Sequence, residues 1–365
     1  MKIDFRSLAH SYIRDLIPYQ PGKPIEELER ELGITASIKL ASNENPLGPS
    51  QKVLEIAKDA LQQAHVYPDG GCYELKQAIA AFLNIEASQI TVGNGSENIL
   101  ELIVKAYLRH DQHAVISQYA FLTIPLILQS YGIHTTVVPA IDFSHDILGM
   151  IKAVNEKTRV LFLVNPNNPT GTYTNANDFD YLMQNIPPSV LVVSDEAYVE
   201  YIKEPDYPHT LGYLNRYPNL IITRTFSKVY ALAALRLGYA ISSTEIADML
   251  NRARLPFNVN TIAAMAAIAA LKDQDHVKKS VHINREGRQQ LRDELEKLHI
   301  RILPSAGNFI TIETADSKDL YQKLLYEGVI IRPLNAYGMQ KHVRVTIGTG
   351  EQNERFLATM QKVLS

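Results

Sequence analysis

The chain has 365 residues, of which 46% are hydrophobic, and its 36 basic and 39 acidic side chains leave a net charge of −3. The length fits two domains, and the composition excludes a disordered chain. A nucleic-acid binder would show a basic excess, so we expect no nucleic-acid partner. The apolar run Thr261–Leu271 is too short to cross a bilayer, and charges throughout residues 1–19 leave no signal-peptide core. Because the single cysteine, Cys72, cannot form an internal disulfide, we expect a cytoplasmic protein.

Short β-branched runs alternate with helical patterns through the middle of the chain. The predicted strands are Gln89–Val92, Ala114–Ser117, Thr135–Val138, Val160–Val164, Val190–Ser194, Leu220–Thr223 and Leu237–Ser242. Several are apolar almost throughout, which is typical of strands buried on both faces of a mostly parallel sheet. Helical patterns such as Glu97–Leu108, Phe121–Tyr131 and Asp178–Gln184 lie between them. The alternation predicts an α/β layer covered by helices, with its active site at the carboxyl edge of the sheet.

The pattern changes after about residue 245. Helical patterns at Thr261–Lys272, Val277–Leu298 and Ser317–Tyr326 combine with short strands at Asn308–Glu313, Val329–Arg332 and Val343–Ile347. This mixture predicts a smaller α+β domain at the C-terminus. The proline-rich start indicates an arm rather than part of either core. We therefore expect an arm at 1–45, a large domain at 46–250 and a small domain at 251–365.

A glycine-rich turn, Gly93-Asn94-Gly95-Ser96, follows a predicted strand and opens a helix. Glycines let the backbone approach an anion, and free amides at a helix N-terminus point toward it. The dinucleotide fingerprint needs a third glycine where this chain has Asn98, which disfavours a nucleotide-binding module or a nicotinamide oxidoreductase. A small phosphate site and a plain turn with Ser96 as the helix N-cap both remain open.

Four further segments place polar groups directly after predicted core strands. They are Asn165–Gly171, Ser194–Tyr198, Thr223–Lys228 and Leu235–Gly238. The carboxyl ends of such strands are where α/β sheets bind ligands. In chain order the segments read Asn-Pro-Thr-Gly, Asp-x-x-Tyr, Ser-Lys and Arg-x-Gly, and in this they resemble the fold-type I pyridoxal-phosphate aminotransferases.

Within that superfamily the chain is most similar to the histidinol-phosphate aminotransferase family. The similarity extends from about residue 12 to Gly348, and the segments that carry it are Ile17–Gly22, Leu40–Pro46, Val66–Asp69 and Arg224–Lys228. It implies the fold-type I architecture, with pyridoxal 5′-phosphate in the large domain and an arm that contributes to the small domain and the dimer. It also implies transfer of the amino group of histidinol phosphate to 2-oxoglutarate, giving glutamate, in histidine biosynthesis. The residues leave open an aromatic amino acid aminotransferase and a decarboxylase of a phosphorylated amino acid such as threonine phosphate.

Two side chains fit the chemistry of this cofactor. A lysine that forms an imine must lose its proton, which desolvation and nearby cations promote. Lys228 fits because it follows a buried strand and lies between Arg224 and Arg236 in the sequence. The pyridine nitrogen needs a buried carboxylate to stay protonated, and Asp195 follows an apolar strand. Glu196 should point elsewhere, and a helix-capping role is the alternative for Asp195.

The resemblance implies further contacts with the cofactor. Asn168 and Tyr198 match donors to its phenolic oxygen, and Tyr119 matches the aromatic ring that stacks on the pyridine, with core packing as the alternative. The matched phosphate contacts are Gly95, Ser96, Thr225, Ser227 and Arg236. Tyr67 matches a tyrosine that reaches the same phosphate from the partner subunit, so we expect a homodimer.

The resemblance also implies a substrate site in the small domain. Arg344 matches the arginine that clamps the acidic end of the substrate, and Tyr19, Asn43 and Arg332 match further substrate contacts. Because exposed arginines are usually solvated, a solvated role is the alternative for Arg332.

The histidines and the cysteine point to no metal or nucleophile. His110 and His113 flank a charged turn and lack a third ligand at metal spacing, which favours a solvated loop. Cys72 has no base nearby in the sequence, so we interpret it as structural.

Overall fold

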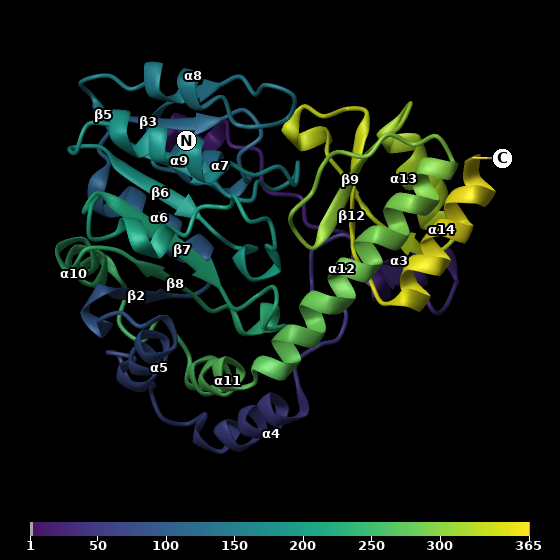
Figure 1. The fold of residues 1–365 in the computed structure, drawn as a ribbon, viewed down its shortest axis with the longest axis horizontal. Coiled ribbons are helices and arrows are strands. Elements are labelled where there is room, and N and C mark those ends of the chain that lie inside the picture. The colour runs from purple at the N-terminus through teal and green to yellow at the C-terminus, as the bar shows by residue number, and fades with distance from the viewer. Residues whose placement is uncertain (1–2, 365) are drawn as a thin grey trace.

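A seven-stranded sheet and a three-stranded sheet form two separate layers in the computed structural model, which describes residues 3–364 (Figure 1). The large sheet has the order β2-β8-β7-β6-β5-β3-β4. Its strands are β2 (Ile90–Gly93), β3 (His113–Ser117), β4 (His134–Val138), β5 (Thr158–Val164), β6 (Leu191–Asp195), β7 (Leu220–Thr225) and β8 (Gly238–Ile241). Only β8 runs antiparallel to its neighbours. The predicted, mostly parallel α/β layer is therefore confirmed.

The central strands of the large sheet are buried on both faces, as their apolar sequences predict, while the edge strand β4 is largely exposed. Along β5, Leu161 and Leu163 face one hydrophobic cluster while Val160 and Phe162 face the other. Successive side chains of a strand point to opposite faces, so each face needs its own helical cover. The first face is covered by α5 (Tyr73–Leu83), α9 (Ala176–Asn185) and α11 (Thr261–Lys272). The second face is covered by α6 (Ser96–Tyr107), α7 (Thr123–Ser130) and α10 (Thr244–Ala253).

Four helices of this domain, α6, α7, α9 and α11, begin within two residues of a predicted start, and the other four were not predicted. In chain order the helices are α4 (Gln51–Ala60), α5 (Tyr73–Leu83), α6 (Ser96–Tyr107), α7 (Thr123–Ser130), α8 (Ile147–Lys152), α9 (Ala176–Asn185), α10 (Thr244–Ala253) and α11 (Thr261–Lys272). Side-chain caps fix several starts: Asn260, for example, accepts from the amide of Ala263 at 2.8 Å. No helix within residues 3–364 is long and apolar enough to cross a membrane.

The small domain packs helices against an antiparallel sheet of order β11-β12-β9. Its elements are α12 (Gln274–Lys297), β9 (Phe309–Glu313), α13 (Ser317–Tyr326), β10 (Val329–Ile330), β11 (Arg332–Pro333), β12 (His342–Thr346) and α14 (Gly350–Leu364). The prediction of one strand over Val329–Arg332 is wrong in one respect, because the run is divided at Ile331. Its first part pairs with β1 (Ile38–Lys39) and its second with β12, so one segment serves two sheets.

The N-terminal segment joins the small domain over part of its length. After α1 (Phe5–Leu8) and α2 (Ser11–Arg14), helix α3 (Ile25–Leu32) buries Leu28 in a cluster with Ala41, Leu325 and Ile330. Residues 25–41 are thus part of a core, although the prolines indicated an arm outside both cores.

The position of α11 bears on the domain boundary. This helix packs against α4 and α5, and its alanines belong to the cluster under the large sheet. Figure 1 shows α12 leading from that end of the large domain to the small sheet. The expected boundary at residue 250 would assign α11 to the small domain. We propose instead that the division falls at the start of α12.

Candidate active site

A cavity of about 380 Å³ lies where three central strands of the large sheet end. Val164, Asp195 and Thr225 are the last residues of β5, β6 and β7, and all three line it. The other lining residues are Ser42, Glu44, Ser96, Glu97, Phe121, Asn168, Ala197, Tyr198, Ser227, Lys228, Ala233, Ala234 and Arg236. The structure therefore brings most of the predicted cofactor residues to one place, at the predicted edge of the sheet.

Lys228 lies on the loop after β7 and is partly buried. Its Nζ donates to the carbonyl oxygen of Ser42 at 3.2 Å and lies 5.7 Å from the ring centroid of Tyr198. Burial, assisted by the positive charge of Arg344, lowers the pKa of Lys228 to about 8. Such a lysine gives up its proton near physiological pH, which a nucleophilic amine requires.

Of the two arginines that the sequence indicated, Arg236 also lowers the pKa of Lys228, but Arg224 does not. Arg224 forms an ion pair with Glu196, at 2.9 Å between Nη2 and Oε2. Glu196 is fully buried and also accepts hydrogen bonds from Ser194 and Thr210. As predicted, Glu196 points away from the cavity, and Arg224, which is paired with it, does not line the cavity either.

Asp195 is 3% exposed, and one of its carboxylate oxygens accepts from the hydroxyl of Thr223 at 2.9 Å. It ends a strand and caps no helix, so the capping alternative does not apply. Burial raises the pKa of Asp195 to about 6. The carboxylate is therefore mostly ionised at neutral pH, and a cation placed against it would stabilise that form.

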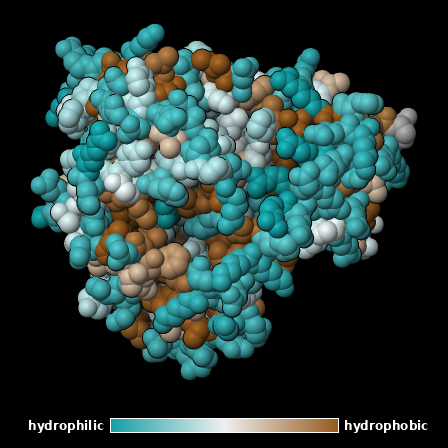
Figure 2. Space-filling model, in the orientation of Figure 1, coloured by the Kyte–Doolittle hydropathy of each residue, from teal (hydrophilic) through white to brown (hydrophobic). Residues whose placement is uncertain are grey.

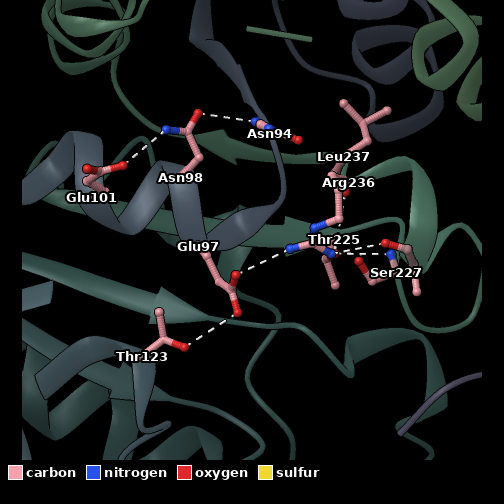
Figure 3. Close-up of polar contacts among 10 residues, drawn as sticks. Asn94, Glu97, Asn98, Glu101, Thr123, Thr225, Ser227, Arg236 and Leu237 are labelled. Carbon is pink, nitrogen blue, oxygen red and sulfur yellow. Dashed lines mark hydrogen bonds and ion pairs between the residues drawn. The ribbon is translucent and has the colours of Figure 1, made fainter. Parts of the chain in front are cut away.

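The glycine turn lies at the other end of the cavity. Gly95 has φ of +82° and is itself the N-cap of α6, so the alternative of a plain turn with Ser96 as N-cap does not apply. A Cβ at Gly95 would lie 2.7 Å from Nη2 of Arg236, so any larger residue would require that guanidinium to shift. Figure 3 shows Arg236 reaching Glu97, at 3.3 Å, beside Thr225.

This end of the cavity gathers donors suited to an anion. The amide of Ser227 donates to the hydroxyl of Thr225 at 3.1 Å, which brings the two residues together next to Arg236 (Figure 3). Hydroxyl groups, a guanidinium and the N-terminus of α6 all favour a negative group, phosphate above all.

Of the two aromatic residues on the loop after β3, Phe121 lines the cavity and Tyr119 does not. Tyr119 stacks on Phe143, with ring centroids 5.8 Å apart, and packs with Leu303, outside the cavity lining. Phe121, two residues further on, lines the cavity. These contacts favour the core-packing alternative for Tyr119, whose predicted stacking on the cofactor stays a prediction. The loop after β3 offers two aromatic residues, and the sequence carries no signal that tells which one faces inward.

Tyr198 and Asn168 both line the cavity and are tied to groups outside it. The hydroxyl of Tyr198 accepts from Nδ2 of Asn43 at 2.9 Å, and the side-chain oxygen of Asn168 accepts from Arg344. Asn43 is 1% exposed and does not line the cavity, so its predicted contact with substrate is not supported. Its side chain instead faces Tyr198.

The two predicted substrate arginines lie opposite each other on adjacent strands. Arg332 of β11 pairs in register with Arg344 of β12, and both are buried. The guanidinium carbon of Arg332 lies 5.1 Å from the ring centroid of Tyr19, so the solvated alternative is excluded for it. Arg344 also donates to the carbonyl of Ala41 at 2.7 Å, while its Nε has no partner within residues 3–364. Two adjacent buried cations predict an anionic ligand between or beside them.

Tyr67 lies outside the cavity of its own chain. It is 80% exposed and stacks on Phe257, with ring centroids 4.9 Å apart. It borders a separate hollow together with His65, Asn260 and other residues of α11 and the loop after α4.

The histidines differ partly from their prediction. His113 is a buried residue of β3 whose two ring nitrogens contact Thr158 and Thr136, rather than part of a solvated loop. Cys72 is buried beside α5, as its structural interpretation requires. Within residues 3–364, no three acidic, histidine or cysteine side chains are grouped as a metal site would need.

A mostly parallel sheet with a buried lysine and carboxylate at its carboxyl edge defines an enzyme of the fold-type I aminotransferase class. Residues 35–360 match the family of aminotransferase class I and II. The chain belongs to this family.

Individual relatives cover the whole chain. Histidinol-phosphate aminotransferase 2 of Pseudomonas fluorescens is 48% identical over 368 residues, which is 100% of both chains. Histidinol-phosphate aminotransferase 1 of Nitrosococcus oceani is 47% identical over 361 residues, covering 99% of this chain and 98% of that protein. The crystal structure of histidinol-phosphate aminotransferase from Sinorhizobium meliloti in complex with pyridoxal-5′-phosphate has a TM-score of 0.89 at 28% identity, covering 98% of each chain.

Proposed function

We propose that this aminotransferase uses pyridoxal 5′-phosphate to move the amino group of histidinol phosphate to 2-oxoglutarate, yielding imidazole-acetol phosphate and glutamate in histidine biosynthesis. The observation that carries the proposal is Lys228, a lysine of lowered pKa in a cavity with an anion-binding end and a buried carboxylate. The similarity to histidinol-phosphate aminotransferases at 47–48% identity over whole chains supports this substrate.

The residues of the cavity fit the proposed cofactor. Its phosphate would be held by the backbone amides at the N-terminus of α6 and by Thr225, Ser227 and Arg236. Its pyridine nitrogen would pair with the carboxylate of Asp195. Its phenolic oxygen requires donors such as Asn168 and Tyr198, and its ring requires a flat apolar neighbour such as Phe121. When bound, the cofactor supplies an electron sink for the carbon that carries the amino group.

Lys228 would perform the proton transfers. As a neutral amine it can accept the proton from the substrate carbon that carries the amino group. As an ammonium it can return a proton to the cofactor carbon bonded to the same nitrogen. A pKa of about 8 makes both forms accessible at neutral pH. Asp195, ionised beside the pyridine nitrogen, would keep that nitrogen protonated.

Arg344 and Arg332 would hold the anionic end of each substrate. Both substrates bring an anion, since histidinol phosphate carries a phosphate and 2-oxoglutarate two carboxylates. A guanidinium pairs with either group through two parallel hydrogen bonds. One arginine pair could therefore serve two unlike substrates in turn.

We also propose that the active form is a cytoplasmic homodimer in which Tyr67 completes the partner's phosphate site. Figure 2 shows hydrophobic residues gathered on the face where α4, α5 and α11 lie in Figure 1. Exposed large hydrophobic side chains of this part of the chain include Leu61, Tyr67, Tyr73, Phe82 and Phe257. A second copy of the chain would cover such a surface. The single cysteine, Cys72, supports a reducing compartment.

Initial rates on four amino donors test the substrate. We expect the highest kcat/KM on histidinol phosphate, compared with phenylalanine, tyrosine and threonine phosphate, together with formation of glutamate from 2-oxoglutarate. Higher kcat/KM on phenylalanine or tyrosine would make the protein an aromatic aminotransferase. Release of carbon dioxide from threonine phosphate without glutamate would make it a decarboxylase.

A further inference from the structure

The segment Leu40–Asn45 lies between the two domains and contacts the reactive residues in succession. The carbonyl of Ala41 accepts from Arg344 at 2.7 Å, and the carbonyl of Ser42 accepts from Lys228 at 3.2 Å. The side chain of Asn43 then donates to the hydroxyl of Tyr198 at 2.9 Å. Three consecutive residues therefore contact the substrate arginine, the catalytic lysine and a proposed cofactor donor.

Asn43 is held on three sides by the small domain. Its backbone N–H donates to the hydroxyl of Thr346 at 2.9 Å, and its side-chain oxygen accepts from the same hydroxyl at 3.3 Å. Its carbonyl oxygen accepts from Nδ2 of Asn308 at 3.0 Å. All three residues are buried, and Asn43 has φ of +55°, a conformation that asparagine tolerates better than most residues.

These contacts determine which way the side chain of Asn43 points. Because its oxygen is bound to Thr346, its NH₂ group is the one that faces Tyr198. A tyrosine hydroxyl has a single proton. When the Tyr198 oxygen accepts from Asn43, the proton of Tyr198 remains free to point into the cavity that its side chain lines.

We propose that Asn43 is a positioning residue that directs the O–H of Tyr198 toward the phenolic oxygen of the cofactor, and that Thr346 and Asn308 hold Asn43 in this orientation. The proposal rests on the cofactor assigned above. Thr346 ends β12 and Asn308 precedes β9, so both belong to the small domain. The direction of the Tyr198 hydroxyl, in the large domain, therefore depends on the position of the small domain.

A spectroscopic pH titration of the holoenzyme tests the proposal. The phenolic oxygen can share the proton on the Lys228 nitrogen, and a donated hydrogen bond from Tyr198 competes with that proton. Losing the donor should therefore raise the pH midpoint at which the visible band of the lysine-bound cofactor changes. We expect upward shifts of roughly one pH unit, the scale of one hydrogen bond, in Tyr198→Phe, Asn43→Gly and Thr346→Val. Glycine tolerates the positive φ of residue 43, and valine matches threonine in shape.

The decisive comparison is a double-mutant cycle. In the Tyr198→Phe background, Asn43→Gly and Thr346→Val should add no further shift, because no hydroxyl remains to be directed. Thr359→Val should leave the midpoint unchanged, because Thr359 is another buried threonine of the small domain and its hydroxyl donates to the backbone carbonyl oxygen of Arg355.

An unchanged midpoint in Asn43→Gly and Thr346→Val would overturn the proposal, and so would equal shifts with and without the Tyr198 hydroxyl. A wild-type chain that develops no cofactor band would instead contradict the proposed function. The two failures are therefore distinguishable.

Discussion

Lys228 and Asp195 have pKa values that burial moves in opposite directions. Burial disfavours the charged form of each, so it lowers the pKa of the lysine to about 8 and raises that of the carboxyl group to about 6. At pH 7 the carboxylate is mostly ionised, and a usable fraction of the lysine is neutral. The same desolvation thus prepares a nucleophile and an anion within one cavity.

Reaction of the cofactor-free chain with pyridoxal phosphate should accelerate as the pH rises through about 8 and then level off. Below the pKa of Lys228 the amine is protonated and cannot act as a nucleophile, so the rate falls as the pH decreases. Stopped-flow absorbance at a series of pH values measures this profile. Lys228→Ala should abolish both the reaction and transamination. Lys76→Ala removes another partly buried lysine of lowered pKa and should change neither.

Asp195→Asn should retain the cofactor but lose most activity. A neutral amide cannot hold the proton on the pyridine nitrogen, and losing a preorganised charge at a reacting centre costs roughly 10²–10³-fold in kcat. Steady-state kinetics and cofactor absorbance measure the two effects separately. Asp146→Asn, which alters an aspartate that caps α8, should affect only stability. Normal turnover in Asp195→Asn would reduce Asp195 to a structural role.

At the residue scale, the sequence predicted which residues lie in the cavity better than it predicted the contacts that their side chains make. Lys228, Asp195 and Tyr198 lie in the cavity because each lies at or just after the end of a buried strand, a pattern visible in the sequence. The pattern does not give the direction of a loop side chain, so it selected Tyr119 where Phe121 faces inward. Asn43 could not be placed either, since its orientation depends on residues about 300 positions away.

The turn between β2 and α6 contains Gly95, whose positive φ and lack of a Cβ leave room for Arg236. Gly95→Ala should raise the dissociation constant of the cofactor at least about tenfold, because the new Cβ would displace Arg236 from the phosphate end. Gly33→Ala is the matched control: it has φ of +65° and nothing within 4 Å of its Cβ. Both variants should lose about 1 kcal/mol of unfolding free energy to backbone strain. Fluorescence titration with pyridoxal phosphate should show weaker binding only in Gly95→Ala.

The paired strands β11 and β12 carry the proposed substrate arginines. Arg344→Ala should raise the KM of histidinol phosphate and of 2-oxoglutarate about 10- to 100-fold, the effect of losing a charged hydrogen bond. The visible cofactor band should persist. Arg301→Ala removes an exposed arginine of the same domain, paired with Glu313 at 3.2 Å, and should leave both KM values unchanged. Loss of cofactor with normal KM values would contradict the substrate role of Arg344.

At the element scale, local pattern predicted every strand of the large sheet. Apolar β-branched runs have one stable place, between two helical layers, so their assignment needs no knowledge of their partners. The run Val329–Arg332 looks the same locally, but its division at Ile331 arises because β1 and β12 compete for it. Pairing with a strand almost 300 residues earlier leaves no mark on the run itself.

At the scale of the molecule, the proposed site lies where the large domain, the small domain and the segment Leu40–Asn45 meet. The large domain supplies the lysine and carboxylate of the cavity, and β11 and β12 of the small domain carry the two proposed substrate arginines, which are not part of the cavity lining. The segment Leu40–Asn45 contacts Arg344, Lys228 and Tyr198. Figure 1 shows the two sheets side by side, joined by α12. A change in the position of the small domain would therefore alter the arginines and the environment of Lys228 together.

Complementation between two inactive variants tests whether the molecule is a dimer with shared sites. Tyr67 is exposed and absent from its own chain's cavity, so we expect it to act in the partner's site. Lys228→Ala and Tyr67→Phe chains should each show low activity alone. After subunit exchange, a mixed dimer has one site with both lesions and one with neither. Random mixing makes half of the dimers mixed, so activity should rise to about a quarter of wild type for a two-fold symmetric dimer. Tyr73→Phe, an exposed tyrosine of α5, should be active alone. If activity does not rise although mass spectrometry shows mixed dimers, Tyr67 acts within its own subunit or in no active site.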